Sequence, residues 1–276
     1  MTTGRWDSSE ATARLILQHY VESVTRDVGD SIAAILLIGS LATGSYVAGP
    51  GDIDQLTILH DTASDEMVKR VQQHIKDSME AFGRAVNLAT AVYRCSDLGR
   101  PWRSDWDLRP ETRHLITVPE ELLRIHEHGQ VIYGTGFEPS QLPTPTMEEM
   151  IAYNQRWRCS NQLVLDRHPE LRPPEEGFSA RIAAQIILSN AAWHYYYATE
   201  RTCFNKHEVA SRLRHEVPGY RFQAAAELAL RVRTSGFEHV APETVESLNR
   251  WCKRIRDWAG AYPVGSVPLT DTDRDR

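Results

Sequence analysis

A Gly-Ser pair and two aspartates, separated by a short glycine-rich spacer, constrain this chain more than any other feature of its sequence. Gly39 and Ser40 follow an apolar run, 32–38, and Asp52 and Asp54 open a second one. Apolar runs of this length with glycine at their ends are typical of buried strands. The segment therefore predicts two strands joined by a short helix-sized piece and a turn, with polar residues at the strand ends.

The two aspartates are one residue apart, so on a strand both carboxylates point to the same side while Ile53 faces the core. Mg²⁺ takes hard oxygen ligands and is commonly held by one or two carboxylates together with substrate phosphates. A lone Asp-x-Asp is more often a solvated turn. Here the Gly-Ser pair, the spacing and the strand context favour a Mg²⁺ site formed by Asp52 and Asp54.

Gly39 and Ser40 suit the phosphate side of the same site. Glycine allows the backbone to approach a triphosphate closely, and a serine hydroxyl with N–H groups at a helix start binds phosphate oxygens. We therefore expect Gly39, Ser40, Asp52 and Asp54 to bind a nucleoside triphosphate together.

This pattern resembles that of the nucleotidyltransferase superfamily, in which a Gly-Ser pair and a spacer precede Asp-x-Asp or Asp-x-Glu. Segments 190–201, 205–210 and 217–221 look like the C-terminal helical domain of streptomycin/spectinomycin (aminoglycoside) adenylyltransferases, a group associated with antibiotic resistance. The resemblance covers most of 30–235. It implies a fold class of α/β plus all-α, with an N-terminal nucleotidyltransferase-fold mixed sheet and helices, followed by a C-terminal helical bundle.

Hydrophobic periodicity, serine caps and prolines predict a matching series of elements. The expected helices are near 8–25, 64–79, 119–128, 146–166, 178–200, 206–215, 221–234 and 241–260, and the expected strands are 32–38, 53–59 and 85–93. Prolines at 139, 143 and 145 mark an extended linker. We predict an α/β domain over 1–138, a linker over 139–145, a helical domain over 146–262 that closes on substrate or nucleotide, and a flexible tail over 263–276.

Charge and composition exclude several classes of function. The 276 residues include 31 Lys and Arg against 37 Asp and Glu, a net charge of −6 that gives no broad attraction to nucleic acid or to an anionic membrane. The four cysteines are widely spaced and predict neither a zinc knuckle nor a disulfide framework. No segment reads as a signal peptide or a membrane span. We expect a cytoplasmic protein.

The third predicted strand raises the main question about catalysis. In the resembled enzymes a glutamate on this strand deprotonates the attacking hydroxyl, and matching the strands places Asn87 there. An amide cannot accept a proton at neutral pH. We therefore consider Asp97, Asp105 and Asp107 as replacement bases, with Asp97 first because it directly follows the strand. The alternatives are a different register or a protein that is not a conventional nucleotidyltransferase. The family's serine before the first aspartate is Gly51 here.

The resemblance also implies contacts to both substrates. Lys206 matches a helical-domain position that would pair with triphosphate oxygens; the alternative is a solvated lysine. In the resembled family a loop tryptophan stacks on the antibiotic and acids bind its amino groups, which implies acceptor contacts from Trp102, Asp105 and Trp106, together with Asn87. The alternative for the tryptophans is a hydrophobic anchor for a long loop.

Together with these residues, the resemblance implies Mg²⁺-dependent transfer of AMP from ATP to a hydroxyl of a small cationic molecule such as an aminoglycoside or aminocyclitol. A second reading is a degenerate fold that binds a nucleotide or small ligand as a regulator, which Asn87 favours and the retained Asp52 and Asp54 oppose. A third is a biosynthetic enzyme with a redirected acceptor or chemistry. The nucleobase and the oligomeric state are left open.

Overall fold

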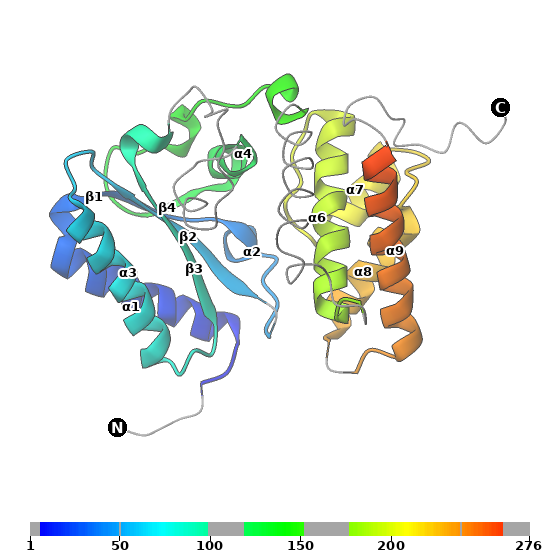
Figure 1. The fold of residues 1–276 in the computed structure, drawn as a ribbon, viewed down its shortest axis with the longest axis horizontal. Coiled ribbons are helices and arrows are strands. Elements are labelled where there is room, and N and C mark those ends of the chain that lie inside the picture. Colours follow the sequence, from blue (N-terminus) through cyan, green and yellow to red (C-terminus); the bar gives the residue numbers. More distant parts are fainter. Residues whose placement is uncertain (1–5, 50, 99–118, 152–176, 238, 262–276) are drawn as a thin grey trace, which may run out of the picture. The chain divides into compact units, whose positions relative to one another are not determined.

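The computed structural model covers residues 1–276 and describes residues 6–49, 51–98, 119–151, 177–237 and 239–261. The chain divides into two compact units, Met1–Pro145 and Thr146–Arg276. Figure 1 follows the chain from the mixed α/β unit, in blue to green, to the helical unit, in yellow to red. Among the helices in the described ranges, none has a stretch long and apolar enough to cross a membrane.

The first unit is built on a four-stranded sheet in the order β3-β2-β1-β4. Its principal elements are α1 (Glu10–Val28), β1 (Ile32–Leu37), α2 (Gly39–Ala42), β2 (Asp52–Leu59), α3 (Asp65–Ala81), β3 (Asn87–Arg94), α4 (Pro119–His128) and β4 (Gln130–Tyr133). Strand β1 is antiparallel to β2 and β4, whereas β2 is parallel to β3. The mixed sheet confirms the predicted fold class.

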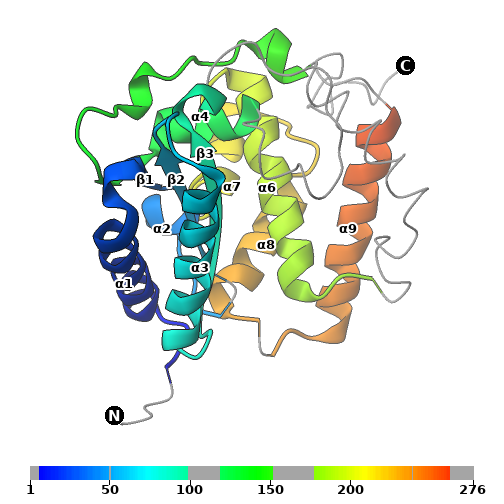
Figure 2. The same ribbon diagram turned by 60° about the vertical axis from the view of Figure 1, so that its left-hand side comes forward.

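Helices α1 and α3 lie side by side against one face of the sheet (Figures 1 and 2). Both begin at serine caps: the Ser9 hydroxyl accepts a hydrogen bond from the Thr12 N–H at 3.3 Å, and the Ser64 hydroxyl accepts one from the Met67 N–H at 3.3 Å. Helix α3 connects β2 to β3, and a helical crossover is the usual way to bring two successive strands into parallel pairing. The Ser64 cap therefore sets the start of the crossover helix as predicted.

Alternation along the strands gives the sheet two buried faces. On the face covered by α1 and α3, the fully buried side chains include Ile16, Tyr20, Ile35, Ile53 and Leu59. On the opposite face, which α4 covers, the buried side chains include Leu36, Leu56, Ile58, Tyr93 and Ile125. Strand residues therefore divide between the two cores by alternation, which the register shift between Ile32 and Ala34 interrupts in β1.

The second unit is a bundle in which α6 packs against three other helices. The described helices of this unit include α6 (Ala180–Thr199), α7 (Val209–Glu216), α8 (Gln223–Ser235) and α9 (Pro242–Ala261). Alanines such as Ala191 on α6 and Ala225 on α8 are buried, and their small side chains allow the helices to approach closely (Figure 2). Inside the bundle His194 Nδ1 and the Tyr220 hydroxyl are hydrogen-bonded at 2.7 Å.

Two elements differ from the sequence prediction. Strand β4 was not predicted, because it has only 4 residues and its first two are exposed, so it shows no apolar alternation. The predicted helix over 146–166 is described only at its start, where 147–151 are helical. There the Thr146 hydroxyl accepts from the Glu149 N–H at 3.2 Å and the Glu149 carboxylate accepts from the Thr146 N–H at 2.7 Å. The remainder of that prediction lies outside the described residues.

Candidate active site

The end of β1 and the beginning of β2 lie side by side. Antiparallel pairing sets Leu37 opposite Gln55, and the Ile38 N–H donates to the Asp54 carbonyl at 2.9 Å. Because β1 ends where β2 begins, Gly39 comes next to Asp54 in space. The Gly-Ser pair and the Asp-x-Asp pair therefore form one local site.

Gly39 makes room for the side chain of Asp54. A Cβ atom added at residue 39 would lie 2.7 Å from Cγ and 2.8 Å from Cβ of Asp54, and nearer still to Oδ2. Gly39 also has a φ angle of +71°, in the left-handed region that side-chain-bearing residues rarely adopt. Both the backbone conformation and the position of the Asp54 carboxylate thus require glycine at residue 39.

Asp52 and Asp54 project from the same side of β2. Both are half-buried, whereas Ile53 between them is fully buried in the core beneath α1 and α3. Leu56 and Ile58 continue the same side of the strand as Asp52 and Asp54 and belong to the core beneath α4. This side of the sheet therefore changes from apolar to charged at the N-terminal end of β2.

The two carboxylates match the ligand set that Mg²⁺ uses when phosphates complete its coordination. Within the described residues, no group of three or more His, Cys, Asp or Glu side chains gathers to hold a metal ion. The Asp52 carboxylate forms no hydrogen bond or ion pair with any residue that the structure describes, so it is available as a ligand. The donor set fits a Mg²⁺ ion shared with a nucleotide better than a metal enclosed by protein ligands alone.

Ser40 lies half-buried at the start of α2. Its backbone carbonyl accepts a hydrogen bond from the Ser45 N–H at 2.8 Å, and the Thr43 hydroxyl donates to the Gly39 carbonyl at 3.1 Å. These bonds fold 39–45 into a compact turn. The Ser40 hydroxyl forms no hydrogen bond with any part of the chain that is described, which leaves it free to bind a phosphate oxygen.

Asn87 lies beside the first aspartate on the neighbouring strand. The parallel register of β2 and β3 pairs Asp52 with Asn87 and Asp54 with Ala89, and Asn87 is exposed. Paired residues in register project to the same side of a sheet. An amide and a methyl group therefore occupy the β3 positions next to the two carboxylates.

The structure does not bring Asp97 to this site. Asp97 follows β3 in a short 3-10 helix, Cys95–Leu98, and its carboxylate accepts a hydrogen bond from the Arg94 N–H at 2.9 Å. Arg94 pairs with Leu59, at the opposite end of β2 from Asp52. Seven strand steps of ~3.3 Å separate the two ends by roughly 23 Å. Asp97 is therefore too far away to act as the base, which corrects that prediction.

The remaining residues expected from the sequence are Lys206, Trp102, Asp105 and Trp106. Lys206 belongs to the second unit, where it is half-buried in a turn that precedes α7. Trp102, Asp105 and Trp106, like Asp107, lie outside the described residues.

Tyr46 is a contact residue of the site that the sequence alone did not reveal. A Cβ atom added at Gly51 would lie 2.7 Å from Cζ of Tyr46, so the ring occupies the space of a side chain at residue 51. Burial and, after it, the negative charge of Asp52 raise the pKa of the Tyr46 hydroxyl above its ordinary value. The sequence gives one hint of this contact. Gly51 stands where the resembled enzymes have a serine, which leaves space for another side chain.

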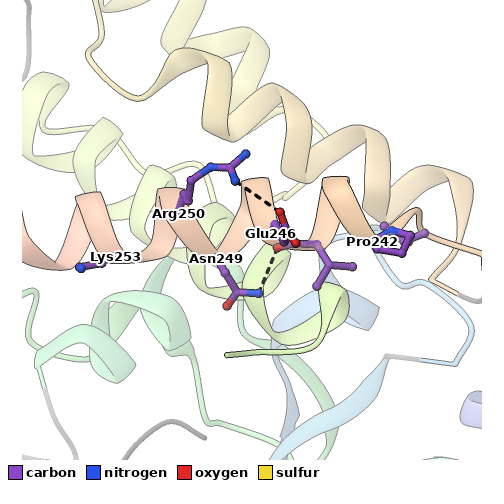
Figure 3. A pocket seen from close by; sticks show the side chains of 7 residues that line it. Pro242, Glu246, Asn249, Arg250 and Lys253 are labelled. Carbon is purple, nitrogen blue, oxygen red and sulfur yellow. Dashed lines mark hydrogen bonds and ion pairs between the residues drawn. The ribbon is translucent and has the colours of Figure 1, made fainter. Parts of the chain in front are cut away.

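The second unit has a pocket along α9. Pro242, Glu246, Asn249, Arg250 and Lys253 line it together with two valines (Figure 3). Glu246 pairs with Arg250 at 3.7 Å, and the Asn249 amide donates to the Val245 carbonyl at 3.0 Å. Among the described residues that line this pocket, none is a site residue predicted from the sequence.

Comparison with solved structures shows a likeness over most of the chain. Spectinomycin adenyltransferase AAD(9) from Enterococcus faecialis, crystallised with ATP and spectinomycin, has a TM-score of 0.52 and 14% sequence identity to this chain. The match covers 87% of this chain and 99% of AAD(9). The chain has the fold of this nucleotidyltransferase. At this identity the likeness establishes the fold alone.

Other structural matches are more partial. Two chains from toxin–antitoxin structures, one a mutant of MntA-HpeT and one with AMP-PNP, have TM-scores of 0.29 and 0.28 and identities of 15% and 16%. Each match covers 54% of this chain, with 95% and 94% of the other chain covered, and TM-scores this low carry no structural argument. No protein-family model and no curated protein sequence matches the chain.

Proposed function

We propose that this protein is a nucleotidyltransferase that transfers AMP from ATP to a hydroxyl group of a small cationic molecule such as an aminoglycoside or aminocyclitol. The observation that carries the proposal is the contact of Gly39 with Asp54 beside the half-buried Asp52. This contact joins a candidate phosphate-binding turn to paired carboxylates on one strand face. AAD(9), which shares the fold, was crystallised with ATP and spectinomycin, so these are the first substrates to test.

Each residue of the site has a defined task in this reaction. Asp52 and Asp54 would hold Mg²⁺, and when bound this ion stabilises the negative charge that builds up on the phosphates during in-line displacement. Ser40 donates its hydroxyl proton in a hydrogen bond to a phosphate oxygen, and the N–H groups at the start of α2 add to this binding. Lys206 is proposed to pair with the triphosphate.

The acceptor side of the proposal rests on residues outside the described ranges. Trp102 and Trp106 would stack on the acceptor and Asp105 would bind its amino groups, since aromatic faces and carboxylates together favour cations. A hydroxyl acceptor must also lose its proton to a base within ~2.6–3.2 Å, or through one water molecule. With Asp97 excluded by its position, Asp105 and Asp107 are the proposed bases.

A second function is supported by the side chain beside Asp52. An amide at Asn87 offers hydrogen bonds but takes up no proton, which suits a protein that binds a nucleotide or small ligand as a regulator without transferring a nucleotidyl group. A biosynthetic enzyme with another acceptor would share the nucleotide half of the site and differ only in the acceptor half.

One screen tests the proposed transferase against these alternatives. Purified protein is incubated with Mg²⁺, each of the common nucleoside triphosphates and a panel of aminoglycosides and aminocyclitols, while pyrophosphate release and triphosphate binding are followed. Acceptor-dependent pyrophosphate release with ATP supports the proposed transferase. Tight triphosphate binding without release for any acceptor supports the regulator or an enzyme with another acceptor, and the absence of both contradicts the candidate site.

A further inference from the structure

The spacer between α2 and β2 closes on itself immediately before Asp52. The Gly51 N–H donates to the Val47 carbonyl at 2.8 Å, and a Cβ atom added at Gly51 would lie 2.7 Å from that carbonyl oxygen and 2.7 Å from Cζ of Tyr46. Residue 51 is thus confined between its own turn and the Tyr46 ring. The strand that carries Asp52 begins directly after this contact.

The other end of the Tyr46 side chain is attached to the beginning of α1. Its hydroxyl donates to the Ser8 carbonyl at 3.0 Å, next to the Ser9 cap, and its ring packs against the core beneath α1 and α3. Tyr46 therefore links a capped helix to the residue that precedes Asp52, across a large separation in the sequence.

Such a link matters because the glycines of the spacer allow its backbone many conformations. Gly44 and Gly49 have φ angles of +69° and +87°, and neither would meet any atom within 4 Å if it carried a Cβ. Glycines gain the most conformational freedom when a segment loosens. A contact that holds residue 51 therefore contributes to the orientation of Asp52 before any ligand binds.

We propose that Tyr46 is a positioning residue for Asp52: its ring against Gly51 and its bond to Ser8 hold the start of β2 in the conformation that binds metal and nucleotide. This inference rests on the proposed function, since the ligand it prepares for is a metal–nucleotide complex. Tyr46 acts through the backbone of residue 51 and contacts no reacting atom itself.

The test compares Tyr46→Leu and Tyr46→Phe with Tyr133→Leu. Tyr133 on β4 also packs partly buried against the core beneath α1 and α3, but its strand partner is Ile35, away from Asp52. Binding of Mn²⁺ with a non-hydrolysable ATP analogue is measured by electron paramagnetic resonance, alongside thermal melts. We expect Tyr46→Leu to weaken Mn²⁺–nucleotide binding by about 10- to 100-fold, a loss typical of removing a residue that orients a metal ligand. Tyr46→Phe, which keeps the ring, should retain part of the affinity, and Tyr133→Leu should retain all of it.

Hydrogen–deuterium exchange of residues 47–54 in metal-free protein gives an independent readout. Exchange should be faster in Tyr46→Leu than in Tyr133→Leu at the same margin below each melting temperature. Equal exchange in the two variants overturns the positioning role, as does unchanged Mn²⁺–nucleotide affinity in Tyr46→Leu. If the wild-type protein binds no Mn²⁺–nucleotide, the proposed function fails, while the exchange comparison still decides whether Tyr46 holds this segment.

Discussion

The carboxylate of Asp54 lies against the Cα atom of Gly39, in the space where a side chain on residue 39 would be. This contact gives a steric reason for the pairing of glycine after one strand with aspartate in the next. Gly39 is needed at once for its φ angle of +71° and for the position of the carboxylate. The phosphate-binding half and the metal-binding half of the proposed site therefore depend on each other.

Substituting alanine at Gly39 should impair both stability and metal–nucleotide binding. An alanine with φ near +71° costs about 1–2 kcal/mol in backbone strain, and its Cβ must also push Asp54 aside. Gly44→Ala is the matched control, because Gly44 has a φ angle of +69° but open space around it. Melting curves should fall for both variants, whereas Mn²⁺–nucleotide affinity should fall only for Gly39→Ala. Equal affinities would show that the contact with Asp54 has no role in binding.

Removing either carboxylate should abolish Mg²⁺-dependent triphosphate binding and leave the fold intact. Asp52→Ala and Asp54→Ala each delete one of two metal ligands, and the side chains are only half-buried, so the free energy of unfolding should change little. Isothermal titration with Mg²⁺ and ATP, paired with melts, measures both effects. Unchanged nucleotide affinity in the double variant would remove the metal site from the proposal.

Asp97→Asn is the corresponding control at the far end of the same strands. The asparagine oxygen can still accept the bond from the Arg94 N–H, which Asp97 accepts at 2.9 Å. Turnover and nucleotide affinity should therefore equal those of the wild-type protein. A drop of ~10²–10⁴ in turnover, the loss expected for a general base, would show that Asp97 reaches the site after all.

A half-buried glutamate on α4 should make stability depend on pH. Burial raises the pKa of Glu121 above its ordinary value of 4.5, although Arg124 and a hydrogen bond with Tyr93 act in the opposite direction. The folded protein thus keeps the proton to higher pH than the unfolded chain. This contribution to stability is fully present below pH 4.5 and is lost as the pH rises through the folded-state pKa.

Glu121→Gln should remove that dependence, because glutamine stays neutral. The difference in melting temperature between Glu121→Gln and the wild type should grow in favour of the variant as the pH increases from 4.5. Glu66→Gln, on α3 with an exposed side chain that forms no ion pair with any described residue, serves as the control and should follow the wild-type curve. Parallel curves for wild type and Glu121→Gln would contradict the raised pKa.

Local signals in the sequence were sufficient for much of the fold. Serine caps placed the starts of α1 and α3, and the apolar runs placed β1, β2 and β3 within a few residues. Strand β4 was missed because its side chains carry little burial pattern and its partner, β1, is distant in the sequence. Pairing between distant segments is a property of the whole sheet, which short-range periodicity does not encode.

The candidate site likewise contains some residues that the sequence pattern revealed and others that it did not. Gly39, Ser40, Asp52 and Asp54 were identifiable because they follow one another in a compact pattern. Asp97 follows β3 directly in the sequence, but β2 and β3 are parallel, so that end of β3 lies far from Asp52. Tyr46 was missed because the sequence does not show which backbone an aromatic ring covers.

The last prediction concerns the amide beside Asp52. Asn87 is exposed and pairs with Asp52, so Asn87→Glu should place a third carboxylate on the same side of the sheet as the first two. Repulsion from its neighbours should raise the pKa of the new carboxyl toward neutrality, which suits a general base. If no other base serves the acceptor, pyrophosphate release should rise by ~10²-fold or more, with an added dependence on pH through the ionisation of residue 87. Asn87→Gln, which lengthens the side chain without adding a base, should show no increase. No gain in Asn87→Glu, together with a ~10²–10⁴ loss in Asp105→Asn or Asp107→Asn, would instead assign the proton transfer to one of those aspartates.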